Sequence, residues 1–108
     1  MMILLALAAA AQLPAKGMPP LTAQTQRSGG AIDPEQAKLA FDHADLSFEV
    51  YPEKRALSGI AILTFTARAP LDRVVLDLDR NYAISAIAVN DVALPKAAWR
   101  NPEGRLTI

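Results

Sequence analysis

The sequence predicts an all-β fold, an antiparallel β-sandwich or saddle that is incomplete at its C-terminal end. Leu46, Phe48 and Val50 alternate with polar residues, and a period of two is typical of a strand with one apolar face. Asn90-Asp91 separates two further apolar runs. Asn and Asp tolerate the positive φ of a two-residue hairpin turn, so this dipeptide predicts antiparallel pairing. With 108 residues, the chain has room for one domain at most.

Residues 1–11 have the character of an export signal peptide. The unbroken apolar run from Ile3 to Ala11 is too short to cross a bilayer as a helix, which takes about 20 residues. Ala9-Ala10-Ala11 fits a signal-peptidase site, and Leu13-Pro14-Ala15 offers a second one, at 15. The basic residue that normally opens such a signal is missing. We expect export to the periplasm or the extracellular space; the alternative is a buried apolar helix of the mature fold.

Residues 12–31 are predicted to form a disordered linker. Their composition shifts to Pro, Gly, Ser, Thr and Gln, which bury too little apolar surface to offset the entropy of ordering the chain. The folded domain is therefore expected to occupy residues 32–108.

The domain is expected to open with a short helix and a first hairpin. Asp33-Pro34-Glu35-Gln36 is a helix-start signature, with Asp33 as the N-cap and Gln36 able to reach back, and it predicts a turn or two of helix to about Ala40. A strand follows from His43 to Tyr51. After a turn at 52–55, a second strand over 57–68 has apolar residues on both parities, so it is either buried on both faces or bulged near Ile62.

Shorter strands are expected in the second half. Residues 73–79 alternate as a half-exposed strand with an acidic outer edge, and 84–94 form the Asn90-Asp91 hairpin. A last alternation begins at Arg105 and reaches Ile108 without a partner strand in the sequence, which predicts an unpaired edge and further strands downstream.

Composition excludes several classes of function. The chain has 11 Lys+Arg, 11 Asp+Glu and a pI near 6.6, whereas nucleic-acid binding depends on clustered positive charge, so no nucleic-acid partner is expected. A single His and no Cys cannot supply a two-histidine zinc site or a thiol nucleophile.

A few polar and aromatic residues are candidates for a binding or metal site. His43 and Asp45 share a strand face, yet a metal needs a third ligand, so a structural pair at the strand start is the expected role. The remaining candidates are carboxylates for calcium or for a glycosidase pair, and aromatic residues for ligand stacking: Asp72, Asp77, Asp79, Glu103, Tyr82 and Trp99. Without a calcium loop, the carboxylates are expected to be solvated. The two aromatic residues are expected to cover a sheet edge or a domain interface.

Three consecutive segments carry a family resemblance. Residues 41–50, FDHADLSFEV, precede the turn 52–55, PEKR, and the segment 57–65, LSGIAILTF. Their succession resembles the opening of the M1 family of zinc aminopeptidases, in which a His-x-Asp-Leu strand, a Pro-x-x-Arg turn and a Ser-Gly-x-hydrophobic strand begin an N-terminal all-β saddle. Residues 70–77 and 84–90 resemble the next strands of that saddle. Asp91 departs from the family, which more often has Gly in this turn.

The resemblance implies a scaffold rather than a catalyst. In the family, zinc, the activated water and the substrate's α-amino group are bound by a following catalytic domain with His-Glu-x-x-His and Gly-x-Met-Glu-Asn motifs. None of these motifs occurs in this sequence. We therefore assign no catalytic, cofactor-binding or metal-binding residue here. Zinc is implied only for the parent chain, and peptide substrate only through its catalytic domain, which would be the partner of this one downstream in the same chain.

A second function class stays open. The 108-residue product could be a stand-alone periplasmic β-sandwich binding module that completes its sheet by dimerising or by capturing a partner strand.

Overall fold

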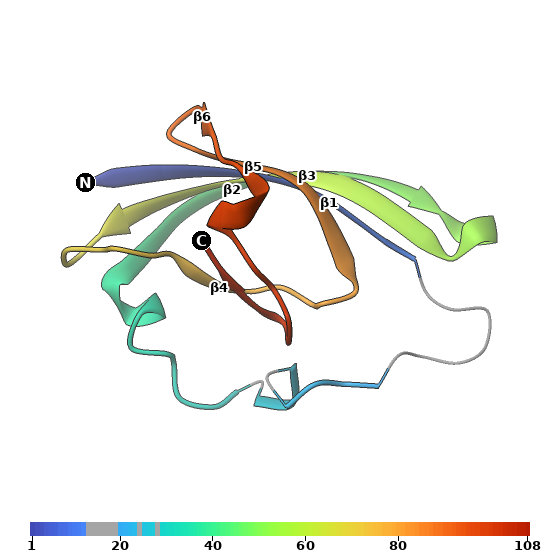
Figure 1. The fold of residues 1–108 in the computed structure, drawn as a ribbon, viewed down its shortest axis with the longest axis horizontal. Helices are drawn as coiled ribbons and strands as arrows, with labels where there is room; N and C mark the ends of the chain where they lie inside the picture. Colours follow the sequence, from blue (N-terminus) through green and yellow to red (C-terminus); the bar gives the residue numbers. More distant parts are fainter. Residues whose placement is uncertain (13–19, 24, 28) are drawn as a thin grey trace.

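The computed structural model describes residues 1–12, 20–23, 25–27 and 29–108, and in them the chain forms two antiparallel sheets (Figure 1). The larger sheet has the strand order β2-β3-β1-β5-β6, and the smaller pairs β4 with β7 beneath one of its faces. The strands are β1 (Met2–Gln12), β2 (Leu39–Tyr51), β3 (Ala56–Ala67), β4 (Val75–Asp77), β5 (Tyr82–Val89), β6 (Val92–Ala93) and β7 (Arg105–Thr107). The predicted all-β fold is confirmed, and its two layers are sandwich-like.

Helical structure is limited to single 3₁₀ turns. These are η1 (Thr25–Arg27), η2 (Gln36–Lys38), η3 (Pro52–Lys54) and η4 (Lys96–Ala98). Across the described ranges, no helix has the length and apolar character needed to cross a bilayer. Residues 13–19, 24 and 28, which include the alternative cleavage position Ala15, lie outside the described residues.

The residues predicted as an export signal form the central strand of the larger sheet. β1 pairs with β3 from Met2↔Thr66 to Gln12↔Ala56, and its other edge pairs with β5. A run of Ile, Leu and Ala without a polar face can be buried as a strand that has both edges paired. Because an export signal is read before a domain folds, the predicted boundaries of signal, linker and domain stay predictions.

The side-chain contacts predicted for the helix start are present, but the 3₁₀ turn begins only at Gln36 and the predicted helix to Ala40 is wrong. Asp33 N donates to Gln36 Oε1 at 3.3 Å, and Glu35 N donates to Asp33 Oδ1 at 2.9 Å. Helical structure ends after η2 because the chain enters the β2–β3 ladder at Leu39. Tertiary pairing thus overrides a correctly capped local signal.

Neither alternative predicted for the second strand is found: Ile60 and Ile62 on the outer side of β3 are exposed, and the bulge lies on the partner strand. β3 is regular, whereas β2 pairs Phe41 with Phe65 and His43 with Thr64, which leaves Asp42 as the extra residue. The Thr66 hydroxyl donates to Asp42 Oδ2 at 2.7 Å and anchors the bulge. Because the bulge shifts the parity of β2, Phe41 comes to lie on the same face as Leu46.

The turn after β5 is the predicted two-residue hairpin. Asn90 and Asp91 have φ of 50° and 65°, and Val89 pairs with Val92. A type I′ turn, whose twist matches that of the flanking strands, requires positive φ at both central residues. The Asp91 departure from the family pattern therefore leaves the hairpin intact.

The last strand is paired, so the expected unpaired edge at Arg105 to Ile108 is wrong. Leu106 pairs with Leu76 in the β4–β7 ladder, and Ile108 and Val74 exchange two backbone hydrogen bonds of 2.9 Å. Arg100 pairs with Thr107 on the other edge. Within the acidic run 73–79, only Val75–Asp77 joins a strand.

The core lies between the two sheets. Its central cluster of buried side chains comes from β1, β3, β5 and β7: Ile3, Leu5, Leu7, Phe65, Ile87 and Leu106. None of the described polar or charged residues is buried. Half of this cluster comes from β1, so the N-terminal strand is the main apolar contributor to the interior.

Candidate functional site: an uncovered apolar face

One face of the larger sheet is apolar across four strands. In register, Leu46 of β2 lies beside Ala61 of β3, which lies beside Leu7 of β1, which lies beside Ile87 of β5. Neighbouring residues in register point to the same side of a sheet. This inner face is the one that the β4–β7 sheet covers.

The cover stops short of β2. Phe41, Leu46, Phe48 and Val50 are all exposed, although they share the inner face with buried core residues; we call these four side chains the β2 face. Phe48 is 59% exposed, whereas Phe65 of β3 is 6% exposed. Figure 1 shows that the η3 end of the β2–β3 hairpin, next to Phe48 and Val50 in the sequence, projects beyond the β4–β7 layer. The predicted apolar side of β2 is thus confirmed in direction, but it is not buried.

Aromatic contact joins the β2 face to the core. The rings of Phe41 and Phe65 meet edge to face, with centroids 6.0 Å apart and an interplanar angle of 69°. This is a favourable geometry for two aromatic rings. Phe41 is therefore held in place although it is exposed, so the face has a fixed shape at this end.

Gly59 fixes the shape of the face further along the hairpin. A Cβ at this position would lie 2.8 Å from Ser47 O and 2.4 Å from Cδ1 of Phe48. Both distances are below normal van der Waals contact, so only glycine fits here. The bare backbone of β3 lets the Phe48 ring lie across it.

A hollow of about 530 Å³ continues from the β2 face toward the core. It is lined mainly by apolar side chains of both sheets, including Leu7, Leu46, Phe48, Leu78 and Tyr82. Tyr82, which the sequence placed at an edge or interface, lies in its wall. Trp99 does not line this hollow; it packs against the core cluster and borders a separate depression with Arg73 and Arg100.

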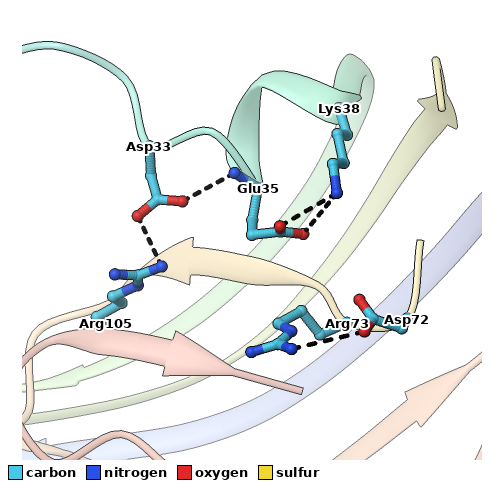
Figure 2. Close-up of polar contacts among 6 residues, drawn as sticks. All are labelled: Asp33, Glu35, Lys38, Asp72, Arg73 and Arg105. Atoms are coloured by element: carbon cyan, nitrogen blue, oxygen red, sulfur yellow. Dashed lines mark hydrogen bonds and ion pairs between the residues drawn. The ribbon is translucent and has the colours of Figure 1, made fainter. Parts of the chain in front are cut away.

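An ion pair holds the segment before β2 against the smaller sheet (Figure 2). Arg105 Nη2 of β7 lies 2.6 Å from Asp33 Oδ2, and the Asp33 side chain is only 16% exposed. The other carboxylate oxygen of Asp33 caps the turn through Glu35 N. This pair fixes Ile32 at the rim of the hollow, where it is a lining residue. Sequence reasoning assigned Asp33 only its cap role, since nothing in the sequence connects it with Arg105.

Asp77 and Asp79, two of the candidate carboxylates, border one depression together with Asp33. Asp79 Oδ1 accepts from Asn81 N at 2.8 Å and from Asn81 Nδ2 at 2.7 Å. The backbone carbonyl of Glu103, not its carboxylate, accepts from the Thr22 hydroxyl. Asp77 is exposed on β4. Among the described residues, no group of three or more His, Asp or Glu side chains is placed to hold a metal ion.

Two other acidic groups have charged or polar neighbours. His43 Nε2 lies 3.4 Å from Asp45 Oδ1, which confirms the predicted pair, although β2 begins at Leu39 and the pair lies within the strand. The Arg73 guanidinium lies 3.5 Å from Asp72 Oδ2 (Figure 2), and its hydrogen bond lowers the pKa of Asp72 below the ordinary value. Both pairs are solvent-exposed, where ion pairs contribute little to stability.

Comparison of the chain with known families, proteins and structures identifies no relative. No protein-family model matches the chain, and neither a curated protein nor a solved structure is significantly similar to it. What the fold and site define is a small β-sandwich-like domain whose second layer covers one apolar sheet face over β1 and leaves it exposed over β2.

Proposed function

We propose that this chain is a non-catalytic β-scaffold that docks onto a further protein domain through the β2 face. The proposal depends on one observation. The β4–β7 sheet buries the apolar face of the larger sheet at β1 and β5 but leaves it exposed at β2. Contiguous exposed apolar surface on a small domain is typical of a protein interface.

We further propose that the docked domain is the catalytic domain of an M1-like zinc aminopeptidase in the same chain. The support is the resemblance of residues 41–65 to the opening of that family's β-saddle, and these same residues form most of the open hairpin. In this proposal, zinc and peptide are bound by the catalytic domain, and the chain is exported to the periplasm or the extracellular space by residues 1–11. The β-domain itself supplies shape and a wall beside the cleft.

Energetics favour one face of β2 over the other. Full burial of a Phe, Leu or Val side chain contributes about 1.5–3 kcal/mol, and each side chain of the β2 face has more than half of its surface still to bury. The opposite side of β2 carries His43, Asp45, Ser47 and Glu49, which lose hydration on burial. Docking is therefore expected through the inner side only.

A pair of photo-cross-linking positions tests the proposal. A photoreactive phenylalanine analogue replaces Phe48 in one full-length variant and Ile60 in the other, because Ile60 is similarly exposed (52%) but lies on the outer side of the sheet. The proposal expects cross-links from position 48 to a segment that follows a His-Glu-x-x-His motif or contains it, and none from position 60. Equal labelling at both positions, or cross-links only to unrelated proteins, would contradict it.

A second function is favoured by the edge position of β2. Among the described strands, β2 pairs only with β3, which leaves the other edge of a 13-residue strand open. Long open edges are sites of strand addition. A stand-alone periplasmic module that dimerises through this edge is the alternative. Because Ser47 O points toward Gly59 of β3, the backbone groups of the preceding residue, Leu46, face the open edge. A concentration-dependent dimer, measured by analytical ultracentrifugation and lost on Leu46→Pro, would favour this alternative.

A further inference from the structure

β1 fills the slot between β3 and β5, and it is joined to the other strands of the sheet at one end only. β1 forms eleven register pairs with β3 and seven with β5. Its only covalent link to the remaining strands passes through the long connection from Gln12 to Leu39. β1 is thus held in the slot mainly by pairing and burial.

Burial of the β1 side chains in the slot alternates along residues 3–7. Ile3, Leu5 and Leu7 point inward and are buried, whereas the neighbouring Leu4 and Ala6 are only partly covered. From Ala8 onward only alanine occupies the slot up to Gln12. The inner side therefore holds large apolar side chains at every second residue of the first half, whereas the inner-facing Ala9 of the second half borders the hollow.

Main-chain recognition in the slot is independent of sequence. Asn90 N donates to Leu4 O at 2.7 Å, and Asn90 Oδ1 accepts from Leu4 N at 2.9 Å, so one residue satisfies both backbone groups of Leu4. The hydroxyl of Ser85, the bulge residue of β5, donates to Ala8 O at 3.2 Å. These polar contacts recognise an extended backbone and no particular side chain.

We propose that the slot between β3 and β5 is a strand-binding site that accepts an extended apolar segment of another polypeptide, antiparallel to both strands, with β1 as its exchangeable occupant. Backbone pairing for affinity and alternate side-chain pockets for selection are the two components of recognition by strand addition. If residues 1–11 are removed on export, the slot is vacated and these donors and acceptors become available. The inference does not rest on the β2 face or on any resemblance.

A nicked form of the full chain provides the test. A protease site inserted after the exposed Leu21 allows cleavage of the folded protein, after which the N-terminal fragment stays bound through β1. Fluorescent peptides of residues 2–12 are then added, and their incorporation is followed by fluorescence anisotropy and native mass spectrometry. The wild-type peptide is expected to replace the fragment stoichiometrically.

Two single-residue peptide variants form a matched pair. Leu5→Lys places a charge at a position that is 0% exposed, whereas Leu4→Lys places the same charge on the outer side of the same strand. Loss of a buried leucine contact makes the Leu5→Lys peptide at least roughly a hundredfold weaker, and the Leu4→Lys peptide is expected to bind within about tenfold of wild type. Equal binding of the two variants, no exchange of the wild-type peptide, or loss of the fold upon nicking would each overturn the proposal.

Discussion

Asn90 forms hydrogen bonds with both backbone groups of Leu4 along one edge of β1. Its backbone N–H donates to Leu4 O, and its side-chain carbonyl accepts from Leu4 N. The positive φ of Asn90, 50°, turns both groups toward β1 at the point where the β5–β6 hairpin begins. One turn residue therefore closes the hairpin and also fixes the register of the central strand.

Replacement of Asn90 tests this double role. Asn90→Gly keeps the positive φ accessible but removes the side-chain acceptor, so Leu4 N loses a partner. We expect a loss of about 1 kcal/mol in the free energy of unfolding, measured by urea denaturation. Asp91→Gly is the matched control at the other positive-φ position, and it should leave stability within about 0.5 kcal/mol. Equal effects of the two substitutions would show that the hydrogen bond from Leu4 N contributes nothing.

Adjacent leucines of β1 should differ sharply in their contribution to the core. Leu5→Ala removes a fully buried side chain at the centre of the cluster, and we expect it to lower the free energy of unfolding by about 3 kcal/mol. Leu4→Ala on the opposite side should cost less than about 1 kcal/mol. Chemical denaturation of both variants provides the comparison. Similar losses, or none, would mean that β1 does not form the central strand in solution.

Gly59 should not tolerate even alanine. The added methyl group would approach Ser47 O to 2.8 Å as well as the Phe48 ring, and overpacking of this kind costs about 1–3 kcal/mol. Because the carbonyl contact remains without the ring, Gly59→Ala should also destabilise a Phe48→Ala background. Thermal melts of the two single variants and the double variant measure this. Full rescue in the Phe48→Ala background would assign the clash to the ring alone.

The β2 face should control self-association of the isolated domain. Phe48→Ser removes an exposed aromatic ring from this face, so it should reduce concentration-dependent association while costing less than about 1 kcal/mol of folding stability. Ile60→Ser, on the outer side, should leave association unchanged. Sedimentation velocity over a concentration series distinguishes them. An equal reduction for both variants would indicate general stickiness rather than a defined face.

Local rules predicted much of this fold. The alternation at 46–50, the Asn90-Asp91 turn and the Asp33 cap all depend on neighbouring residues, and the structure contains each of them. β1 was not predicted as a strand because Leu4 and Ala6 are as apolar as Leu5 and Leu7, which hides the period of two that the burial pattern reveals.

The candidate site depended on relationships that no local pattern carries. Phe41 joins Leu46 on one face only because Asp42 is bulged, and that bulge has no marker in the sequence. The exposure of Phe48 depends on how far the β4–β7 sheet extends, which is decided by the packing of distant segments. The sequence therefore predicts which face of a strand a side chain lies on more readily than whether another layer buries that face.

The mass of the native polypeptide that contains residues 33–55 tests the proposed function most directly. Mass spectrometry with peptide mapping of envelope extracts should find a mass several times 11.6 kDa, with peptides that continue past Ile108 into a His-Glu-x-x-His segment. A polypeptide no larger than residues 12–108 would contradict the aminopeptidase proposal and leave a small β-domain that binds its partners in trans.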